Sequence, residues 1–181
     1  MHRDLKPSNI LVVETDGRPT PRIIDFGVAK SVSQESFEGP MLTGIGRMVG
    51  TPGYISPEQA DPAVVNVDTR TDVYSLGVVL YELLSGYLPF DPKQWQGENF
   101  WDAIRQLKEE DPPRPSTKVA SDTHGSTPAA GSRQTAAPHL VSLLRGDLDW
   151  ITAKALEKDR ERRYGTPSEL TSDAFSLTNP S

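Results

Sequence analysis

The fold of this chain is decided near its start, by residues 1–12, MHRDLKPSNILV, and by residues 22–30, RIIDFGVAK. Between them, two short apolar segments, 10–13 and 22–24, are separated by ETDGRPTP. Because Asp-Gly and proline favour turns, this arrangement predicts a β-hairpin with a rather long loop. A hairpin turns the chain back on itself, so we expect the polar residues before and after it to lie close together.

Downstream of the hairpin the sequence predicts helices. In SPEQA, Ser56 can cap a helix, Pro57 suits the first helical position, and Gln59 can complete a capping box. Residues 72–85 are apolar nearly all round, which is typical of a helix at the centre of a domain. Gly86 is then expected to end that helix.

The C-terminal half mixes helical patterns with a polar segment. Large apolar residues recur at helical spacing over 100–107, and a helical pattern returns in LDWITAKALEK before a capping-box sequence at 166–169, TPSE. Residues 111–138 contain almost no large apolar side chain, so we expect a mobile insertion there that cannot offset its ordering entropy. Residues 1–181 are therefore expected to form one domain with this insertion inside it.

The composition excludes several classes of protein. With 181 residues, 35% of them hydrophobic, the chain fits one globular domain. A net charge of -6 gives no basic footprint, so no nucleic-acid partner is expected. No cysteine is present, which rules out disulfides and fits a reducing compartment. We expect no signal peptide and no membrane segment, because the longest apolar run, VYSLGVVLYELL, is too short to span a bilayer and contains Glu82.

Four motifs then occur in a fixed order: HRDLKPSN, DFG, GTPGYISPE and DVYSLG. Each alone arises easily by chance, but as an ordered set around a predicted hairpin they resemble the protein kinase superfamily. The resemblance covers nearly all of the chain and corresponds to the larger lobe of the kinase fold, so the implied fold class is mainly α with a small β-hairpin. The ending LDWITAKALEKDRERRY and the long insertion are similar to bacterial Hanks-type Ser/Thr kinases.

The resemblance implies transfer of the γ-phosphate of ATP to Ser or Thr hydroxyls of protein substrates. In such a reaction the protein supplies mainly position and electrostatics. By resemblance, Asp4 accepts or orients the proton of the attacking hydroxyl, while Asn9 and Asp25 hold Mg²⁺ through their oxygen atoms. ATP, as co-substrate, and Mg²⁺ are therefore the implied cofactors.

Three further positions bear on the nucleotide and the acceptor. Lys6 follows Asp4 where Ser/Thr-specific members carry a lysine that contacts the transferring phosphate; the alternative is a plain surface lysine. Thr51 resembles the threonine that touches the catalytic loop in Ser/Thr kinases. Leu11 matches a position under the adenine ring, and it is equally compatible with an ordinary core residue.

The same resemblance implies structural roles for six residues: His2, Phe26, Gly27, Glu58, Asp72 and Arg163. Asp72 suits the N-terminus of the central helix by its charge and would hold the backbone around His2 and Arg3. Glu58 would pair with Arg163, although this alignment is looser because Arg160 stands where the family often has proline. Breaking one side of a buried pair costs about 3–5 kcal/mol.

The resemblance also suggests regulation. Arg3, beside the catalytic aspartate, would receive a phosphate from the activation loop, residues 28–56. That loop offers Ser31, Ser33, Ser36 and Thr43. Thr43 is favoured because it resembles the autophosphorylated position of bacterial receptor-like kinases; an unmodified threonine is the alternative. GIGRMVG, residues 44–50, has neither the spacing nor the context of a glycine-rich phosphate loop.

The chain does not contain the glycine-rich strand pair, strand lysine and helix glutamate that complete a kinase site. We therefore expect the N-terminal lobe to be missing from these residues, and the 181-residue polypeptide alone to be nearly inactive. Met1 is expected to be an internal residue of a longer kinase whose catalytic portion is cytoplasmic. The alternative is a stand-alone pseudokinase or protein-binding module, and the coding sequence upstream of Met1 would distinguish the two.

Overall fold

The computed structural model of the chain describes residues 1–25, 52–61, 63, 64, 67–92, 95, 100–122 and 127–176. Over these residues the protein is mostly helical, with one two-stranded antiparallel sheet. The elements in chain order are η1 (Pro7–Asn9), β1 (Ile10–Thr15), β2 (Arg18–Ile23), η3 (Pro52–Tyr54), α1 (Pro57–Ala60), α2 (Thr69–Ser85), α3 (Phe100–Glu109), α4 (Pro115–Ala120), α5 (Pro128–Ser132), α6 (Ala137–Leu144), α7 (Asp147–Ala155), η4 (Arg160–Arg162) and α8 (Pro167–Ser176).

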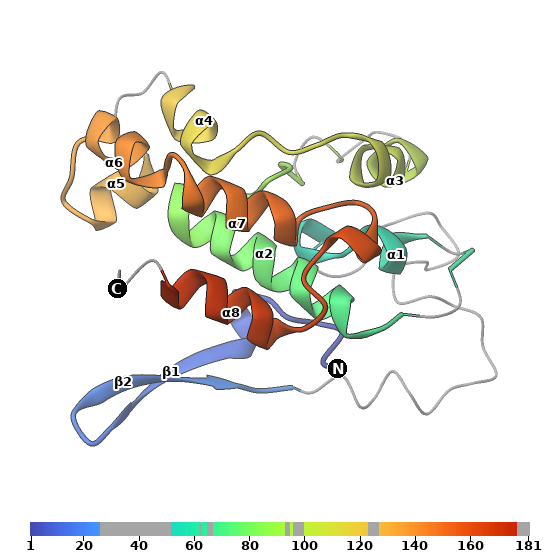
Figure 1. Cartoon of the computed structure of the whole chain (residues 1–181), viewed down its shortest axis with the longest axis horizontal. Coiled ribbons are helices and arrows are strands. Elements are labelled where there is room, and N and C mark those ends of the chain that lie inside the picture. Colours follow the sequence, from blue (N-terminus) through green and yellow to red (C-terminus); the bar gives the residue numbers. More distant parts are fainter. Residues whose placement is uncertain are drawn as a thin grey trace.

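Helix α2 is the centre of the helical body. Figure 1 shows α1 and α3 near its N-terminal end and α4 to α6 near its C-terminal end, and both α7 and α8 pack against it. Its apolar side chains enter different buried clusters: Val78 packs with Leu156, Val73 with Ile151, and Leu84 against the cluster that α4, α5 and α6 form. Burial on several sides is what the all-round apolar sequence predicts.

Both ends of α2 carry identifiable caps. The Asp68 side chain accepts a hydrogen bond from the Arg70 amide, and Gly86 ends the helix in the left-handed conformation with φ of 82°. The helix therefore begins slightly before its first apolar residue, with Asp72 inside its first turn. Within the described ranges, no helix is both long enough and apolar enough to cross a membrane.

The hairpin is tighter than the sequence suggests. Its strands pair from Ile10 opposite Ile23 to Thr15 opposite Arg18, which leaves a two-residue turn at Asp16 and Gly17, both with positive φ. The long loop was predicted because of the two prolines of the segment, which instead lie within β2. They are tolerated because they alternate along the strand. The Ile24 amide bonds to the Asn9 carbonyl, and counting from that pair puts both prolines where the backbone nitrogen faces away from β1.

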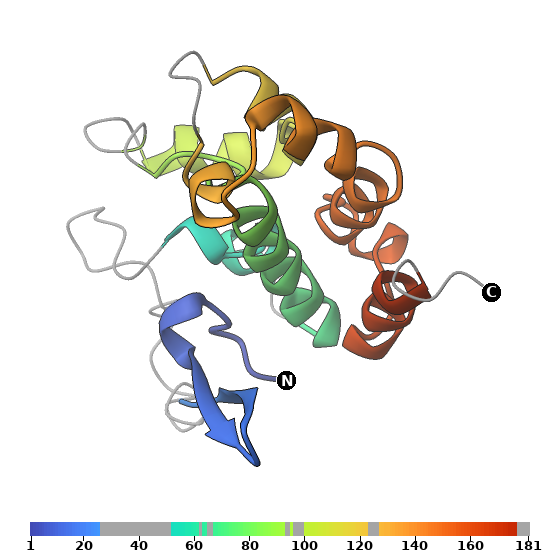
Figure 2. The ribbon, with the colours of Figure 1, turned by 90° about the vertical axis from the view of Figure 1, so that its left-hand side faces the viewer.

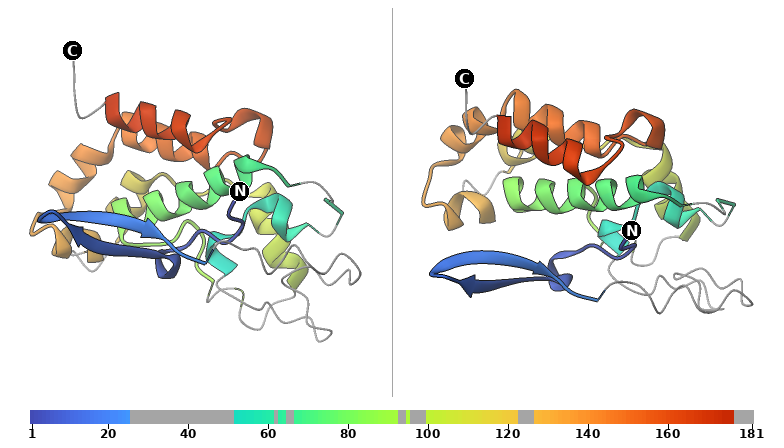
Figure 3. Two further views of the ribbon diagram at one scale, coloured as in Figure 1. Left: turned by 90° about the horizontal axis from the view of Figure 1, so that it is seen from below. Right: turned by 60° about the horizontal axis from the view of Figure 1, so that its bottom comes forward.

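The hairpin stands apart from the helices along most of its length. Figure 2 shows it projecting from the helical body, and in Figure 3 α2 lies between the hairpin and the pair α7 and α8. Its base is anchored through Ile10, which packs against the cluster around Tyr74 and Val78. Val12, farther along β1, is 69% exposed. The base of the hairpin is therefore the part whose position the body controls.

The segment 111–138 differs from the expected unpacked insertion. Its described residues include α4 and α5, and Val119, Ala129 and Ala130 are buried in one cluster with Leu140 of α6. The buried carboxylate of Asp149 also accepts hydrogen bonds from the amide and hydroxyl of Ser116 at the start of α4. Small side chains and buried polar contacts hold this part of the chain in place. The prediction of an unpacked insertion missed them because it considered only large apolar residues.

Gly86 provides a test of how the C-terminal end of α2 packs. A Cβ atom there would lie 2.7 Å from the Ala129 amide nitrogen, whereas at Gly17, with φ of 72°, it would meet nothing within 4 Å. We expect Gly17→Ala to lower the free energy of unfolding by about 1–2 kcal/mol, through backbone strain alone. Gly86→Ala should cost a further 1–3 kcal/mol or so from overpacking against α5. Urea unfolding measures both, and equal losses would contradict the described contact.

Candidate active site

The catalytic loop, residues 2–9, is fastened to α2 by one carboxylate. The backbone amides of His2 and Arg3 donate to the two oxygens of Asp72, at 2.7 and 2.8 Å. Asp72 is buried, and a buried carboxylate requires such donors. The contact predicted from the sequence is present, and it fixes the start of the loop relative to the most buried helix.

Arg3 has an unusual backbone conformation. Its φ is 69°, in the left-handed region, which costs a residue with a side chain about 1–2 kcal/mol. The residue is held on both sides: its amide by Asp72 and its carbonyl by the Gln59 side chain, whose Nε2 donates to it at 2.8 Å. The surrounding contacts therefore impose a conformation that Arg3 would not adopt alone.

Asp4 is oriented by two neighbours in the loop. Asn9 Nδ2 donates to the Asp4 carbonyl at 2.8 Å and lies 3.2 Å from Asp4 Oδ2. Lys6 Nζ is 3.0 Å from the same carboxylate oxygen, and 35% of the Asp4 side chain stays exposed. The carboxylate is thus fixed in direction and still reachable from solvent.

His2 links the loop to the end of the hairpin. Its Nε2 lies 2.9 Å from the Ile24 carbonyl, while its Nδ1 faces the Asp4 amide at 3.3 Å. One tautomer serves both contacts, with the proton on Nε2. Because the Ile24 amide also bonds to the Asn9 carbonyl, the chain at Ile24 is held beside Asn9, and Asp25 follows at once. Asp25 is exposed and has φ of 54°.

Asn9 and Asp25 have side-chain oxygens of the kind that would hold a magnesium ion. Both Asp4 atoms near the Asn9 amide are acceptors, so its nitrogen must face them and its oxygen is directed elsewhere. Among the described residues, no group of three or more His, Cys, Asp or Glu side chains could hold a metal. A site with few protein oxygens suits Mg²⁺, which usually keeps several water molecules and takes phosphate oxygens as ligands.

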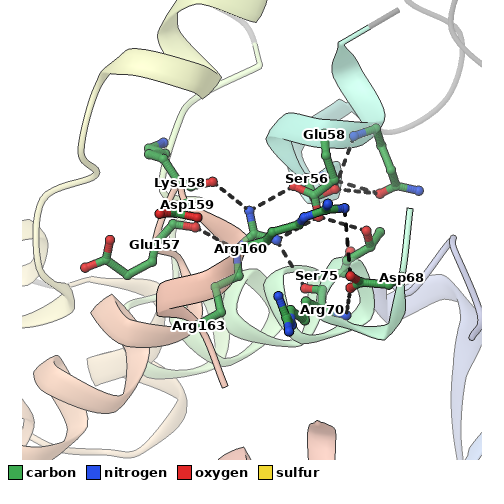
Figure 4. Close-up of polar contacts among 12 residues, drawn as sticks. Ser56, Glu58, Asp68, Arg70, Ser75, Glu157, Lys158, Asp159, Arg160 and Arg163 are labelled. Carbon is green, nitrogen blue, oxygen red and sulfur yellow. Dashed lines mark hydrogen bonds and ion pairs between the residues drawn. The ribbon is translucent and has the colours of Figure 1, made fainter. Parts of the chain in front are cut away.

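A second polar cluster lies where α1, the start of α2 and residues 157–163 meet (Figure 4). Arg163, whose side chain is completely buried, donates to Glu58 from Nη1 at 2.7 Å and from Nη2 at 2.8 Å. Thr71 of α2 donates to the same carboxylate, and the guanidinium lies 4.9 Å from the centre of the Tyr74 ring. The remaining guanidinium donors go to the carbonyls of Arg70, Glu157 and Lys158. All five donors of Arg163 are therefore used, and the predicted pair is present.

The charge of Glu58 depends on this cluster. Burial alone would raise the pKa of Glu58, but the hydrogen bonds and charge of Arg163, together with the bond from Thr71, hold it below its ordinary value of 4.5. Since the pKa is lower in the folded chain than in the unfolded one, the pair adds stability that is complete above about pH 4.5. That stability is lost as the pH falls through the lowered pKa.

A family model, the protein kinase domain, matches residues 1–175. The chain belongs to the protein kinase family. Its bacterial relatives include the serine/threonine-protein kinase pkn3 of Myxococcus xanthus, 35% identical over 173 residues, which are 92% of this chain and 29% of the relative. The serine/threonine-protein kinase PknB of Mycobacterium tuberculosis is 34% identical over 179 residues, 99% of this chain and 23% of the relative. The chain thus spans less than a third of the length of either relative.

The structure brings some of the kinase residues predicted from the sequence together and leaves others apart. His2, Arg3, Asp4, Lys6, Asn9 and Asp72 form one connected network. Asp25 lies beside it, and Leu11, on β1, is 47% exposed, so the described residues do not bury it as core. Phe26, Gly27, Thr43 and Thr51 lie outside the described residues. The parts assigned to those four by resemblance, including a phosphate on Thr43 that meets Arg3, stay predictions.

Sequence reasoning missed the contacts that Gln59 of α1 and Tyr54, near the end of the activation loop, make with distant residues. It gave Gln59 only a capping part, but the side chain also reaches the catalytic loop. The Tyr54 hydroxyl of GTPGY donates to Glu82 of α2 at 2.5 Å, while Ser75 donates to the Tyr54 carbonyl. Burial and then Glu82 raise the pKa of Tyr54, so its hydroxyl remains a donor. The sequence held one signal for the contact of Gln59 with Arg3: the capping box has Gln, which can donate a hydrogen bond, where Glu would also serve.

Replacing Glu58 tests the buried pair of the kinase lobe. We expect Glu58→Ala to lower the free energy of unfolding by about 3–5 kcal/mol, because it leaves the Arg163 charge buried without its partner. Asp102→Ala is the matched control, since it removes a carboxylate that pairs with Arg105 at the surface, at 3.3 Å. Its cost should be about 0–1 kcal/mol. Similar losses for the two variants, measured by urea unfolding at pH 7, would refute the importance given to the pair.

Proposed function

We propose that this protein is the catalytic lobe of a Ser/Thr protein kinase, which transfers the γ-phosphate of ATP to hydroxyl groups of protein substrates. One observation carries the proposal: the Asp4 carboxylate is oriented by Asn9 and Lys6 and is still reachable. A reachable carboxylate of fixed direction suits a group that must accept or orient the proton of an incoming hydroxyl.

Lys6 has a second part in this proposal. Its ammonium group lies beside Asp4 and is only partly exposed, with 20% of the side chain accessible. A cation at that position can stabilise negative charge on the transferring phosphate while Asp4 holds the acceptor. The proposal for Ser or Thr acceptors rests on the kinase relatives and on the resemblance of Lys6 and Thr51, and not on a contact in the described residues.

The oxygens of Asn9 and Asp25 are the atoms proposed to hold Mg²⁺. The ion, when bound with ATP, neutralises charge on the phosphate oxygens. The chain contributes position: η1 and the base of the hairpin bring Asn9 beside Ile24, and Asp25 is the next residue. Leu11, exposed on β1, is proposed to lie under the adenine ring.

We further propose that the 181-residue polypeptide alone transfers phosphate very slowly. It has no glycine-rich strand pair over the phosphates and no strand lysine to grip them. Loss of a single electrostatic donor at a reacting centre commonly costs about 10²- to 10³-fold in rate. A binding module without transfer activity is the other candidate, but nothing in such a module requires the arrangement of Asp4, Lys6 and Asn9.

The experiment compares phosphate transfer from labelled ATP to a generic Ser/Thr protein substrate. It uses the 181-residue polypeptide, the longest protein that its coding region specifies, and the Asp4→Asn variant of each. We expect the longest protein to form phosphoserine or phosphothreonine, and Asp4→Asn to lower its rate by about 10²- to 10⁴-fold.

The outcomes separate the proposals. A shorter polypeptide that matches the longest protein would overturn the proposed inactivity. Unchanged transfer in Asp4→Asn would remove the role of Asp4. Absence of transfer in every form, with ATP and Mg²⁺ present, would favour the binding module.

A further inference from the structure

Helix α1 is short, but two adjacent side chains on it reach distant parts of the chain. Glu58 bonds to Arg163, which lies 105 residues away in the sequence, and Gln59 bonds to Arg3, which lies 56 residues away. The first contact ties α1 to the C-terminal part of the helical body, together with Thr71 of α2. The second runs from this fixed helix into the catalytic loop. α1 is therefore a junction between the body and the loop.

The two ends of the Gln59 amide do different things. Its Oε1 accepts from the Ser56 amide at 3.4 Å, which closes the capping box of α1, and its Nε2 donates to the Arg3 carbonyl at 2.8 Å. A capping box accepts glutamate as well as glutamine. A glutamate carboxylate is an acceptor only, so it cannot make the second bond. Glutamine at this position is thus needed for the contact with Arg3 and not for the helix.

The contact with Gln59 controls one particular peptide group, the one that joins Arg3 to Asp4. Its oxygen is held by Gln59 at 2.8 Å, whereas its N–H faces His2 Nδ1 at the longer distance of 3.3 Å. The positive φ of Arg3 is set by the preceding peptide, whose N–H is bonded to Asp72, so rotation of the Arg3–Asp4 peptide, which changes ψ of Arg3 and φ of Asp4, is the freedom that Gln59 removes. Such a rotation would change the direction in which the Asp4 side chain leaves the backbone.

We propose that Gln59 is a positioning residue for phosphoryl transfer: by holding the Arg3 carbonyl, it keeps the Arg3–Asp4 peptide in the orientation that aims the Asp4 carboxylate. The inference rests on the proposed function, because it matters only if Asp4 acts on the acceptor hydroxyl. It also joins α1, the helix that follows the activation loop, to the catalytic base through one neutral side chain. An error of about 1 Å in such a group can cost roughly 100-fold in rate.

The test uses the longest active form of the protein and three variants. Gln59→Glu keeps the capping box and removes the donor to Arg3, and Gln59→Met removes the donor without adding a charge. Ser56→Ala is the control: it loses the hydroxyl that caps α1 and that donates to Gln59 Oε1 at 3.3 Å, but it keeps the Gln59 donor to the Arg3 carbonyl. For each variant, kcat for a Ser/Thr substrate, KM for ATP and the melting temperature are measured.

We expect both Gln59 variants to lower kcat by roughly 10- to 100-fold. KM for ATP should stay within about twofold of the unaltered protein, because the loss falls on the alignment of the acceptor and not on nucleotide binding. Gln59→Glu should melt near the unaltered protein. Ser56→Ala should melt at a lower temperature and keep most of its kcat. A purely structural role for Gln59 would give the opposite pattern, with kcat following the melting temperature in all three variants.

Three results would overturn the inference. One is a Gln59→Met protein with kcat close to that of the unaltered protein, which would assign any loss in Gln59→Glu to the added charge. The second is a Ser56→Ala loss in kcat as large as that of the Gln59 variants. The third is a loss that appears in KM for ATP alone. If Gln59→Glu fails to fold, Gln59→Met decides by the same criterion. An unaltered protein that transfers no phosphate would instead refute the proposed function.

Discussion

The rest of the site depends on the carboxylate of Asp72. It sits in the first turn of α2, where the helix N-terminus favours a negative charge, and it accepts the backbone amides of His2 and Arg3. Because α2 is packed on several sides, it provides a rigid reference for the loop. A backbone held by a buried carboxylate cannot shift without exposing that charge or leaving it without donors, and either is costly. The central helix thus sets where the catalytic loop begins.

From that point, hydrogen bonds fix the backbone of the loop group by group. Gln59 holds the Arg3 carbonyl, Asn9 holds the Asp4 carbonyl, and the Ile24 amide holds the Asn9 carbonyl. These bonds to main-chain groups on both sides of Arg3 are what allow its strained conformation to persist. The consequence for chemistry is a carboxylate whose direction is fixed and whose surface is open. Preorganisation of this kind is the main contribution a protein can make to phosphoryl transfer.

Much of this arrangement could be predicted from the sequence, because the local helix and turn patterns agreed with the order of the four kinase motifs. The capping box at Ser56, the all-round apolar helix that Gly86 ends, and the pair of Glu58 with Arg163 are all present in the structure. Each of them follows from the residue types themselves: a capping serine, an apolar run ended by glycine, and an acid with a matching arginine. The roles assigned to Asp4, Lys6, Asn9 and Asp25 stay predictions, since geometry places these residues without showing the reaction.

Three features were not predicted correctly. The hairpin turn was misjudged because both prolines were taken as turn residues, whereas the effect of proline in a strand depends on which way each backbone nitrogen faces. The packing of α4 and α5 depends on small side chains and on the buried contact of Ser116 with Asp149. The contact of Gln59 with Arg3 depends on how α1 lies against the loop. The last two are set by tertiary geometry, which leaves no periodic pattern in the sequence.

The most direct test of this account is amide hydrogen exchange in the Asp72→Asn variant. Asparagine puts an NH₂ group in place of one of the two carboxylate oxygens, so one of the two amides then faces a donor and not an acceptor. The account predicts that at least one of the His2 and Arg3 amides loses its protection in this variant, while the Val78 amide in the middle of α2 remains protected. If the His2 and Arg3 amides stay as protected as in the unaltered protein, the carboxylate of Asp72 does not hold the loop, and the central claim is wrong.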